Sequence, residues 1–105
     1  MDRKSFAIDY AKKFLRECES QNIPIGKAIL FGSFVSGKSH RYSDIDLAIV
    51  SERFSENAIE NGHLICKANH KFLKIEAHPF EIKYFEEGDP FIDEIKRTGI
   101  ELEWA

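Results

Sequence analysis

The sequence has 105 residues, enough for one domain of ordinary size and too few for two. Its residues are 43% hydrophobic and 31% charged, a composition that predicts a globular protein and argues against an intrinsically disordered one. The formal net charge is −3, which argues against a nucleic acid bound along a whole face of the protein. We therefore expect a single domain over residues 1–105, in which a small anionic ligand could bind at one point.

Cysteine content and the apolar runs indicate the cell compartment. Cys18 and Cys66 lie far apart, and the first residues lack the apolar core of a secretory signal. The longest apolar runs have four residues, whereas a helix that spans a membrane needs about 20. We expect a cytoplasmic protein with reduced thiols and no membrane segment.

The first half of the chain predicts one helix and two strands. Apolar residues recur every three or four positions over residues 3–19, which predicts an amphipathic helix. An apolar run over 28–31 predicts a short buried strand that ends at Gly32. A polar stretch then leads to an alternating and increasingly apolar segment over 44–50, which predicts a central strand.

The second half predicts two more helices and two more strands. We expect helices over 55–68 and 90–97 from their capping residues and apolar spacing. Alternation over 72–77 predicts a third strand that ends before Pro79, and residues 100–104 predict a last strand or extended tail. Most aromatic side chains are expected in the core, although Trp104 could contact another chain.

The loop from Gly32 to Ser39 matches the pattern of a P-loop, in which glycine, four residues and glycine precede lysine and serine. A P-loop opens a long helix, but only four residues separate Ser39 from the next predicted strand. Asp44 and Asp46 also precede their hydrophobic run, whereas a P-loop protein has its aspartate after one. The context therefore argues against a P-loop, although the glycine-serine turn can still approach an anion closely.

Three carboxylates suggest a cation site. Asp44 and Asp46 are two apart on a predicted strand, so their side chains share one face. Two like charges side by side are costly unless a cation lies between them, and oxygen ligands suit Mg²⁺. A solvated pair at a strand edge is the alternative reading.

Glu76 would lie beside Asp44 and Asp46 if the third strand packed on the same core as the second. Bringing Ser33, Asp46 and Glu76 together would require the second strand to run antiparallel to both of its neighbours. We therefore expect an α/β (α+β) fold with a mixed, largely antiparallel four-stranded sheet and helices mainly on one face.

The segments Leu30–Ser33 and Ser43–Val50, with Gly37 between them, closely resemble the signature of the minimal nucleotidyltransferases of the DNA-polymerase-beta-like superfamily. The resemblance implies a nucleotidyltransferase fold in which Gly32 and Ser33 hold a nucleoside triphosphate. Lys38 and Ser43 belong to the same loop and are assigned to nucleotide binding with them.

The same resemblance implies that the catalytic metal ligands are Asp44, Asp46 and a carboxylate on a later strand. Glu76 is our candidate for the third ligand, where the family more often has aspartate. Two Mg²⁺ ions would bracket the attacking and leaving oxygens, while Glu76 takes the proton of the acceptor hydroxyl.

The implied reaction transfers a nucleoside monophosphate, most simply AMP from ATP, to a hydroxyl on a partner protein or small molecule. Members of this family are often paired with a toxin that they neutralise, so the chain could be the antitoxin of such a pair or could form a homo-oligomer. A non-catalytic module that binds nucleotide or a partner is the alternative.

The histidines offer two further candidate sites. His63, Cys66 and His70 have the spacing of neighbours on one helix face, but no fourth ligand suggests zinc, so surface or core roles are favoured. His78 follows Glu76 by two residues and could shape the acceptor pocket.

Overall fold

The computed structural model describes residues 2–104, beginning with a long helix, α1 (Arg3–Ser20). The Asp2 side chain caps this helix by accepting a hydrogen bond from the backbone N–H of Ser5 at 2.7 Å. Its buried face contains Ala7, Ala11, Phe14, Leu15 and Cys18. The helix expected over residues 3–19 is therefore confirmed.

The sheet has four strands in the order β3-β2-β1-β4. They are β1 (Lys27–Phe31), β2 (Ile45–Ser51), β3 (Ile75–Glu81) and β4 (Ile100–Glu101). β1 runs antiparallel to both β2 and β4, whereas β2 and β3 are parallel. The expectation of a mixed sheet is confirmed, but the expectation that the second strand is antiparallel to both neighbours is wrong.

The connection between β2 and β3 explains their direction. It contains α3 (Ala58–Lys71), which is capped by Asn57, whose side chain accepts a hydrogen bond from the backbone N–H of Glu60 at 3.0 Å. A strand that returns through a helix can pair in parallel with the first strand. β3 also lies later than expected and includes Pro79, which an edge strand tolerates because a proline nitrogen is not needed for pairing there.

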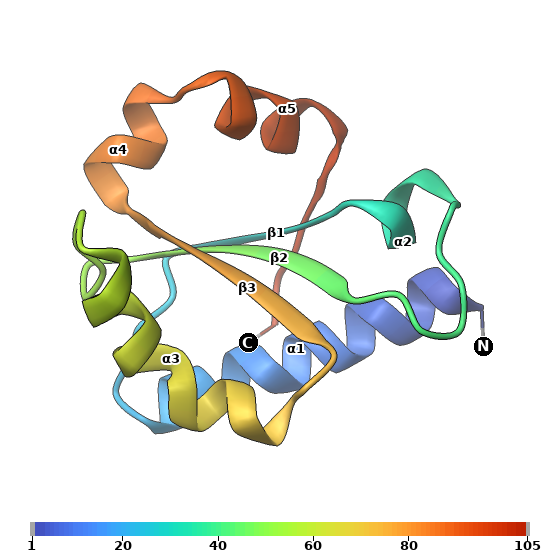
Figure 1. Ribbon diagram of the computed structural model, residues 1–105, viewed down its shortest axis with the longest axis horizontal. Helices are drawn as coiled ribbons and strands as arrows, with labels where there is room; N and C mark the ends of the chain where they lie inside the picture. Colours follow the sequence, from blue (N-terminus) through green and yellow to red (C-terminus); the bar gives the residue numbers. More distant parts are fainter. Residues whose placement is uncertain (1, 105) are drawn as a thin grey trace.

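Helices lie on both faces of the sheet (Figure 1). α1 and α3 cover one face, where the larger core forms with the inward side chains of β1 and β2. On the opposite face lie α4 (Ile82–Glu87) and α5 (Pro90–Thr98), which contribute Phe85, Ile92 and Ile95 to a smaller core. The expectation of helices mainly on one face therefore needs correction: the longer helices share one face, but α4, which the sequence did not predict, and α5 cover part of the other.

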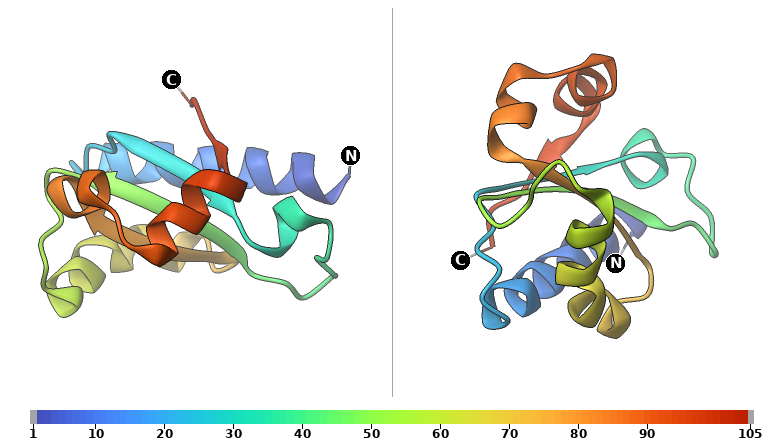
Figure 2. Two further views of the ribbon diagram at one scale, coloured as in Figure 1. Left: turned by 90° about the horizontal axis from the view of Figure 1, so that it is seen from above. Right: turned by 60° about the vertical axis from the view of Figure 1, so that its left-hand side comes forward.

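The short helix α2 (Ser33–Ser36) lies at the end of β1 (Figure 2), and its Phe34 side chain packs into the larger core. It is followed by the loop that leads into β2. The two segments that carry the nucleotidyltransferase-like signature are thus joined at one end of the sheet.

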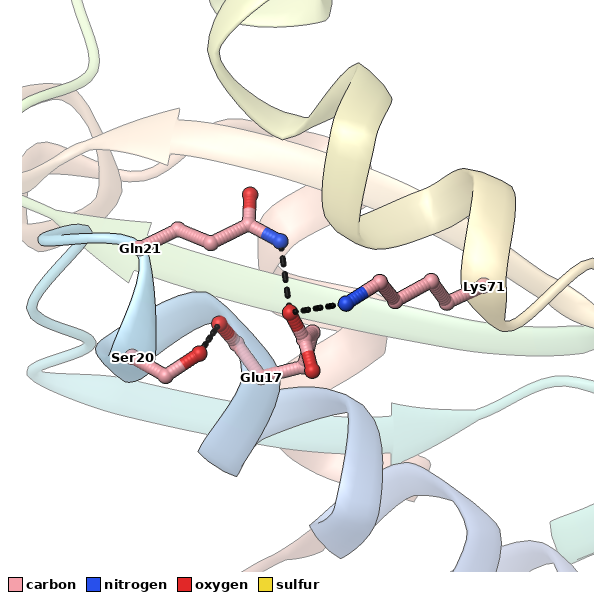
Figure 3. Close-up of polar contacts among 4 residues, drawn as sticks. All are labelled: Glu17, Ser20, Gln21 and Lys71. Atoms are coloured by element: carbon pink, nitrogen blue, oxygen red, sulfur yellow. Dashed lines mark hydrogen bonds and ion pairs between the residues drawn. The ribbon is translucent and has the colours of Figure 1, made fainter.

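Polar contacts link the two helices of the larger layer. The Glu17 carboxylate on α1 accepts hydrogen bonds from Gln21 at 2.7 Å and from Lys71 of α3 at 3.1 Å (Figure 3). These hydrogen bonds lower the pKa of Glu17. Such an exposed ion pair contributes little stability, so apolar packing is the main force that holds α1 against α3.

The expectations for Trp104 and for membrane segments can be compared with the structure. Trp104 is half-buried against the larger core, and its indole N–H donates a hydrogen bond to Glu19 at 3.0 Å, so it is not a free surface contact. No helix within residues 2–104 combines the length and the apolar character needed to cross a membrane.

Gly99 is predicted to be essential for the packing of α5 on the sheet. A Cβ atom there would lie 2.4 Å from Ile29 Cγ2, 2.6 Å from the Ile95 carbonyl oxygen and 2.9 Å from the Leu30 carbonyl oxygen. Because two of these neighbours are backbone atoms, Gly99→Ala should lower the free energy of unfolding by about 1–3 kcal/mol, measured by urea denaturation. Gly62→Ala is the matched control, since Gly62 has open space in α3 and alanine should stabilise the helix by about 0.5–1 kcal/mol. Equal effects of the two substitutions would contradict this account.

Candidate active site

The turn after β1 brings the backbone against an acidic side chain. Gly32 has φ +81° and ψ −152°, a conformation that L side chains rarely adopt. A Cβ atom at Gly32 would lie only 2.2 Å from Asp46 Oδ2. The space between this turn and Asp46 therefore admits only glycine.

Asp46 and Glu76 are neighbours because β2 and β3 are parallel and in register. Phe31, Asp46 and Glu76 are paired across the three strands, so their side chains share one face of the sheet. This is the face covered elsewhere by α4 and α5. Each acid is the second residue of its strand, so the two carboxylates meet at the same end of the sheet.

His78 completes the only group of three or more possible metal-ligating side chains within residues 2–104. One ligand atom from each of Asp46, Glu76 and His78 lies within 4.8 Å of the others. The distance between His78 Nε2 and Asp46 Oδ1 is 3.4 Å. From the sequence, His78 was expected only to shape an acceptor pocket. Its two-residue spacing from Glu76 on a strand was the signal that it shares the face of the acids.

The electrostatics of the two acids favour a bound cation. A hydrogen bond with the Asp46 carboxylate raises the pKa of Glu76, and partial burial and the negative charge of Asp46 act in the same direction. A divalent cation beside both groups would offset this repulsion. The donor set fits such an ion, although it offers a nitrogen as well as carboxylate oxygens.

The other predicted site residues lie outside this group. Asp44 is exposed and immediately precedes β2, so the strand begins one residue later than the expected position of Asp44. The Ser43 hydroxyl accepts a hydrogen bond from the His40 N–H at 2.8 Å, and the Ser43 carbonyl oxygen accepts one from Lys74 at 3.0 Å. In the structure, Ser43 therefore stabilises the loop that carries Asp44.

Ser33 is the first residue of α2, and Lys38 follows the helix after Gly37. Ser33 is half-buried beside Gly32, while the Lys38 side chain is exposed. α2 has only four residues and ends at Gly37, whose φ is +84°. The long helix that a P-loop would require is absent from the described residues, in agreement with the sequence context.

Lys38 is expected to contribute only modestly to nucleotide affinity. Because its side chain is exposed, Lys38→Ala should weaken binding of a nucleoside triphosphate by roughly twofold to fivefold, measured by calorimetry. A complete loss of binding would instead support a P-loop mechanism.

The structure gives no support to a zinc site on α3. His63, Cys66 and His70 are all exposed on α3, and no metal-ligating group in the part of the chain that the structure describes includes them. The surface roles favoured by the sequence analysis agree with these positions.

A mixed sheet that presents a glycine turn to two paired carboxylates can bring phosphate groups and a divalent cation together, which defines the chain as a candidate phosphate-handling enzyme domain. A sequence model of the nucleotidyltransferase domain matches residues 11–101. The chain therefore belongs to the nucleotidyltransferase domain family, as the sequence signature predicted. A comparison with proteins of curated function gave no match.

Two solved structures share the fold. One is a protein from Sulfolobus solfataricus assigned to the nucleotidyltransferases, with a TM-score of 0.68 and 17% identity over 94% of this chain and 81% of that chain. The other belongs to a toxin-antitoxin complex with AMP-PNP, with a TM-score of 0.59 and 22% identity over 90% of this chain and 73% of that chain. At these identities the two structures support the nucleotidyltransferase fold, and the class of enzyme follows from the family.

Proposed function

We propose that this chain uses Mg²⁺ or a similar divalent cation to transfer a nucleoside monophosphate, AMP from ATP in the simplest case, to a hydroxyl group. The observation that carries the proposal is the contact between the Gly32 turn and Asp46, with Glu76 in register beside it. A triphosphate that approaches the turn would lie against the two carboxylates. That arrangement suits reaction at phosphorus, in which positioning and charge do most of the work.

Each residue of the site has a proposed role. Asp46 and Glu76 hold the cation, and Asp44 is proposed as a ligand of a second one from its exposed position before β2. Bound cations would supply the positive charge that neutralises the phosphate oxygens during attack on the α-phosphorus. Glu76 accepts the proton of the acceptor hydroxyl.

The phosphate groups are proposed to bind along the loop after β1. Gly32 allows the backbone to approach them closely, and the Ser33 hydroxyl donates to a phosphate oxygen. Lys38 and Ser43 border the same loop and supply further polar contacts from its far end.

The acceptor is proposed to be a hydroxyl on a partner protein or on a small molecule. The fold likeness to a component of a toxin-antitoxin complex with AMP-PNP supports a protein acceptor, with this chain as the antitoxin of such a pair. A second copy of the chain is the other candidate partner. Both Cys18 and Cys66 are free thiols, which supports a reducing location such as the cytoplasm.

The acceptor can be identified by isolating the protein from its native cells with its bound partners and analysing each chain by mass spectrometry. We expect an adduct of one or more nucleoside monophosphates on a serine, threonine or tyrosine hydroxyl of a partner. Co-expression with Asp46→Asn should remove the adduct. An adduct that persists with this variant would show that another enzyme makes it.

A non-catalytic binding module is the second candidate. The observation in its favour is that His78 Nε2 lies 3.4 Å from Asp46 Oδ1, next to a glutamate where the family more often has aspartate. Calorimetry that detects binding of ATP with Mg²⁺, combined with no transfer to any copurified partner, would support this role over catalysis.

A further inference from the structure

His78 is held in a fixed position beside the two carboxylates. Its ring centroid lies 5.1 Å from that of Phe31 and 5.9 Å from that of Phe91 at the start of α5. His78 is paired with Ala48, so its side chain shares the sheet face of Asp46 and Glu76. The two aromatic rings leave Nε2 directed at the acids.

The distances favour a metal ligand over a simple hydrogen bond. The separation of 3.4 Å between His78 Nε2 and Asp46 Oδ1 is longer than the usual range of about 2.7–3.2 Å for a nitrogen donor and an oxygen acceptor. Ligand atoms at about 2.0–2.2 Å from one ion lie roughly 3–4 Å apart. The ligand atoms of Asp46, Glu76 and His78 all lie within 4.8 Å of one another, close to that spacing.

We propose that His78 supplies a nitrogen ligand to the cation held by Asp46 and Glu76, so that this site prefers Mn²⁺ or another transition-metal ion to Mg²⁺. The inference rests on the cation site of the proposed function and adds the identity of its preferred ion. Mg²⁺ favours oxygen ligands, whereas an imidazole suits first-row transition metals. Two carboxylates and one imidazole therefore favour a transition-metal ion over Mg²⁺, whereas three carboxylates suit Mg²⁺.

The inference is tested on the purified chain with metal ions alone and without nucleotide. Electron spin echo measurements on the Mn²⁺-loaded protein should detect a directly bound ¹⁴N nucleus, and calorimetry gives the affinities for Mn²⁺ and Mg²⁺. His78→Gln should abolish the nitrogen signal and weaken Mn²⁺ binding by roughly tenfold or more. It should change Mg²⁺ binding by less than about threefold.

His63→Gln is the matched control, because His63 is an exposed histidine on α3 and should leave both the signal and the affinities unchanged. Circular dichroism establishes that His78→Gln is folded, and His78→Asn provides a second variant if it is not. Absence of the nitrogen signal in the wild-type protein, or equal loss of Mn²⁺ and Mg²⁺ affinity in the folded variant, would overturn the inference.

These outcomes are separate from those of the proposed function. A protein that transfers nucleotide with Mg²⁺ but shows no nitrogen signal would retain the proposed function and lose this inference. A protein with a His78-dependent Mn²⁺ site but no transfer activity would do the reverse.

Discussion

Replacing Asp46 with asparagine should reduce the rate of nucleotide transfer by roughly 10²–10³-fold or more. Asparagine has nearly the same shape as aspartate but lacks the negative charge, so it fits beside Gly32 and binds a cation much more weakly. The Asp46 side chain lies against Gly32, is in register with Glu76 and approaches His78. Loss of its negative charge therefore removes the group that connects the Gly32 turn to the cation site. The initial rate of label transfer from α-labelled ATP measures the effect.

The control for this substitution is Asp9→Asn. Asp9 is exposed on α1, where it forms an ion pair with Lys13, and its replacement should leave the transfer rate within roughly twofold of the wild type. Thermal unfolding shows whether both variants are folded. A folded Asp46→Asn variant that is as active as the Asp9→Asn control would exclude the proposed role of Asp46.

Gly32→Ala should have a comparable effect on activity and a large effect on stability. The new Cβ would lie 2.2 Å from Asp46 Oδ2 at a residue whose φ is +81°, so either the turn or the carboxylate must move. We expect the free energy of unfolding to fall by about 1–3 kcal/mol and transfer activity to be lost. Urea denaturation and the same label-transfer assay measure the two effects.

Gly37→Ala separates backbone strain from the contact with Asp46. Gly37 has φ +84°, but a Cβ atom there would meet nothing within 4 Å. We expect a loss of about 1–2 kcal/mol in stability with activity largely retained. If Gly32→Ala were as active as Gly37→Ala, close approach of the Gly32 backbone to Asp46 would not matter for function.

The local sequence was sufficient to predict the elements that have strong periodicity or capping residues. The capped and amphipathic α1, the apolar β1 that ends at Gly32 and the apolar run of β2 lie close to their expected positions. The glycine-serine step and the aspartates that follow it were recognisable because few residue types can meet those conformational and chemical demands. The family assignment depended on these same residues.

Strand direction was mispredicted although the sequence held a relevant signal. A helix was expected between the second and third strands, and such a crossover allows parallel pairing. Placing Glu76 at the end of its strand led instead to an antiparallel arrangement. Glu76 lies beside Asp46 as expected, but for a different reason: both acids are at the start of parallel strands.

Other parts of the fold and site depend on tertiary contacts that local sequence does not specify. α4 has six residues and no side-chain cap, so it left no clear sequence pattern. Phe91, expected in the core, is 47% exposed at the start of α5 and lies near His78. Asp44 falls just outside β2, which begins at Ile45.

The Gly32 turn and the Asp46–Glu76 pair are proposed to carry out nucleotidyl transfer together. The most direct measurement compares ATP labelled at the α-phosphate with ATP labelled at the γ-phosphate, using the native complex of the wild-type chain with divalent cations. We expect label from the α-phosphate to appear on the acceptor with release of pyrophosphate, whereas label from the γ-phosphate should not appear there. Transfer of the γ-label, or transfer of the α-label that is undiminished by Asp46→Asn, would contradict this proposal.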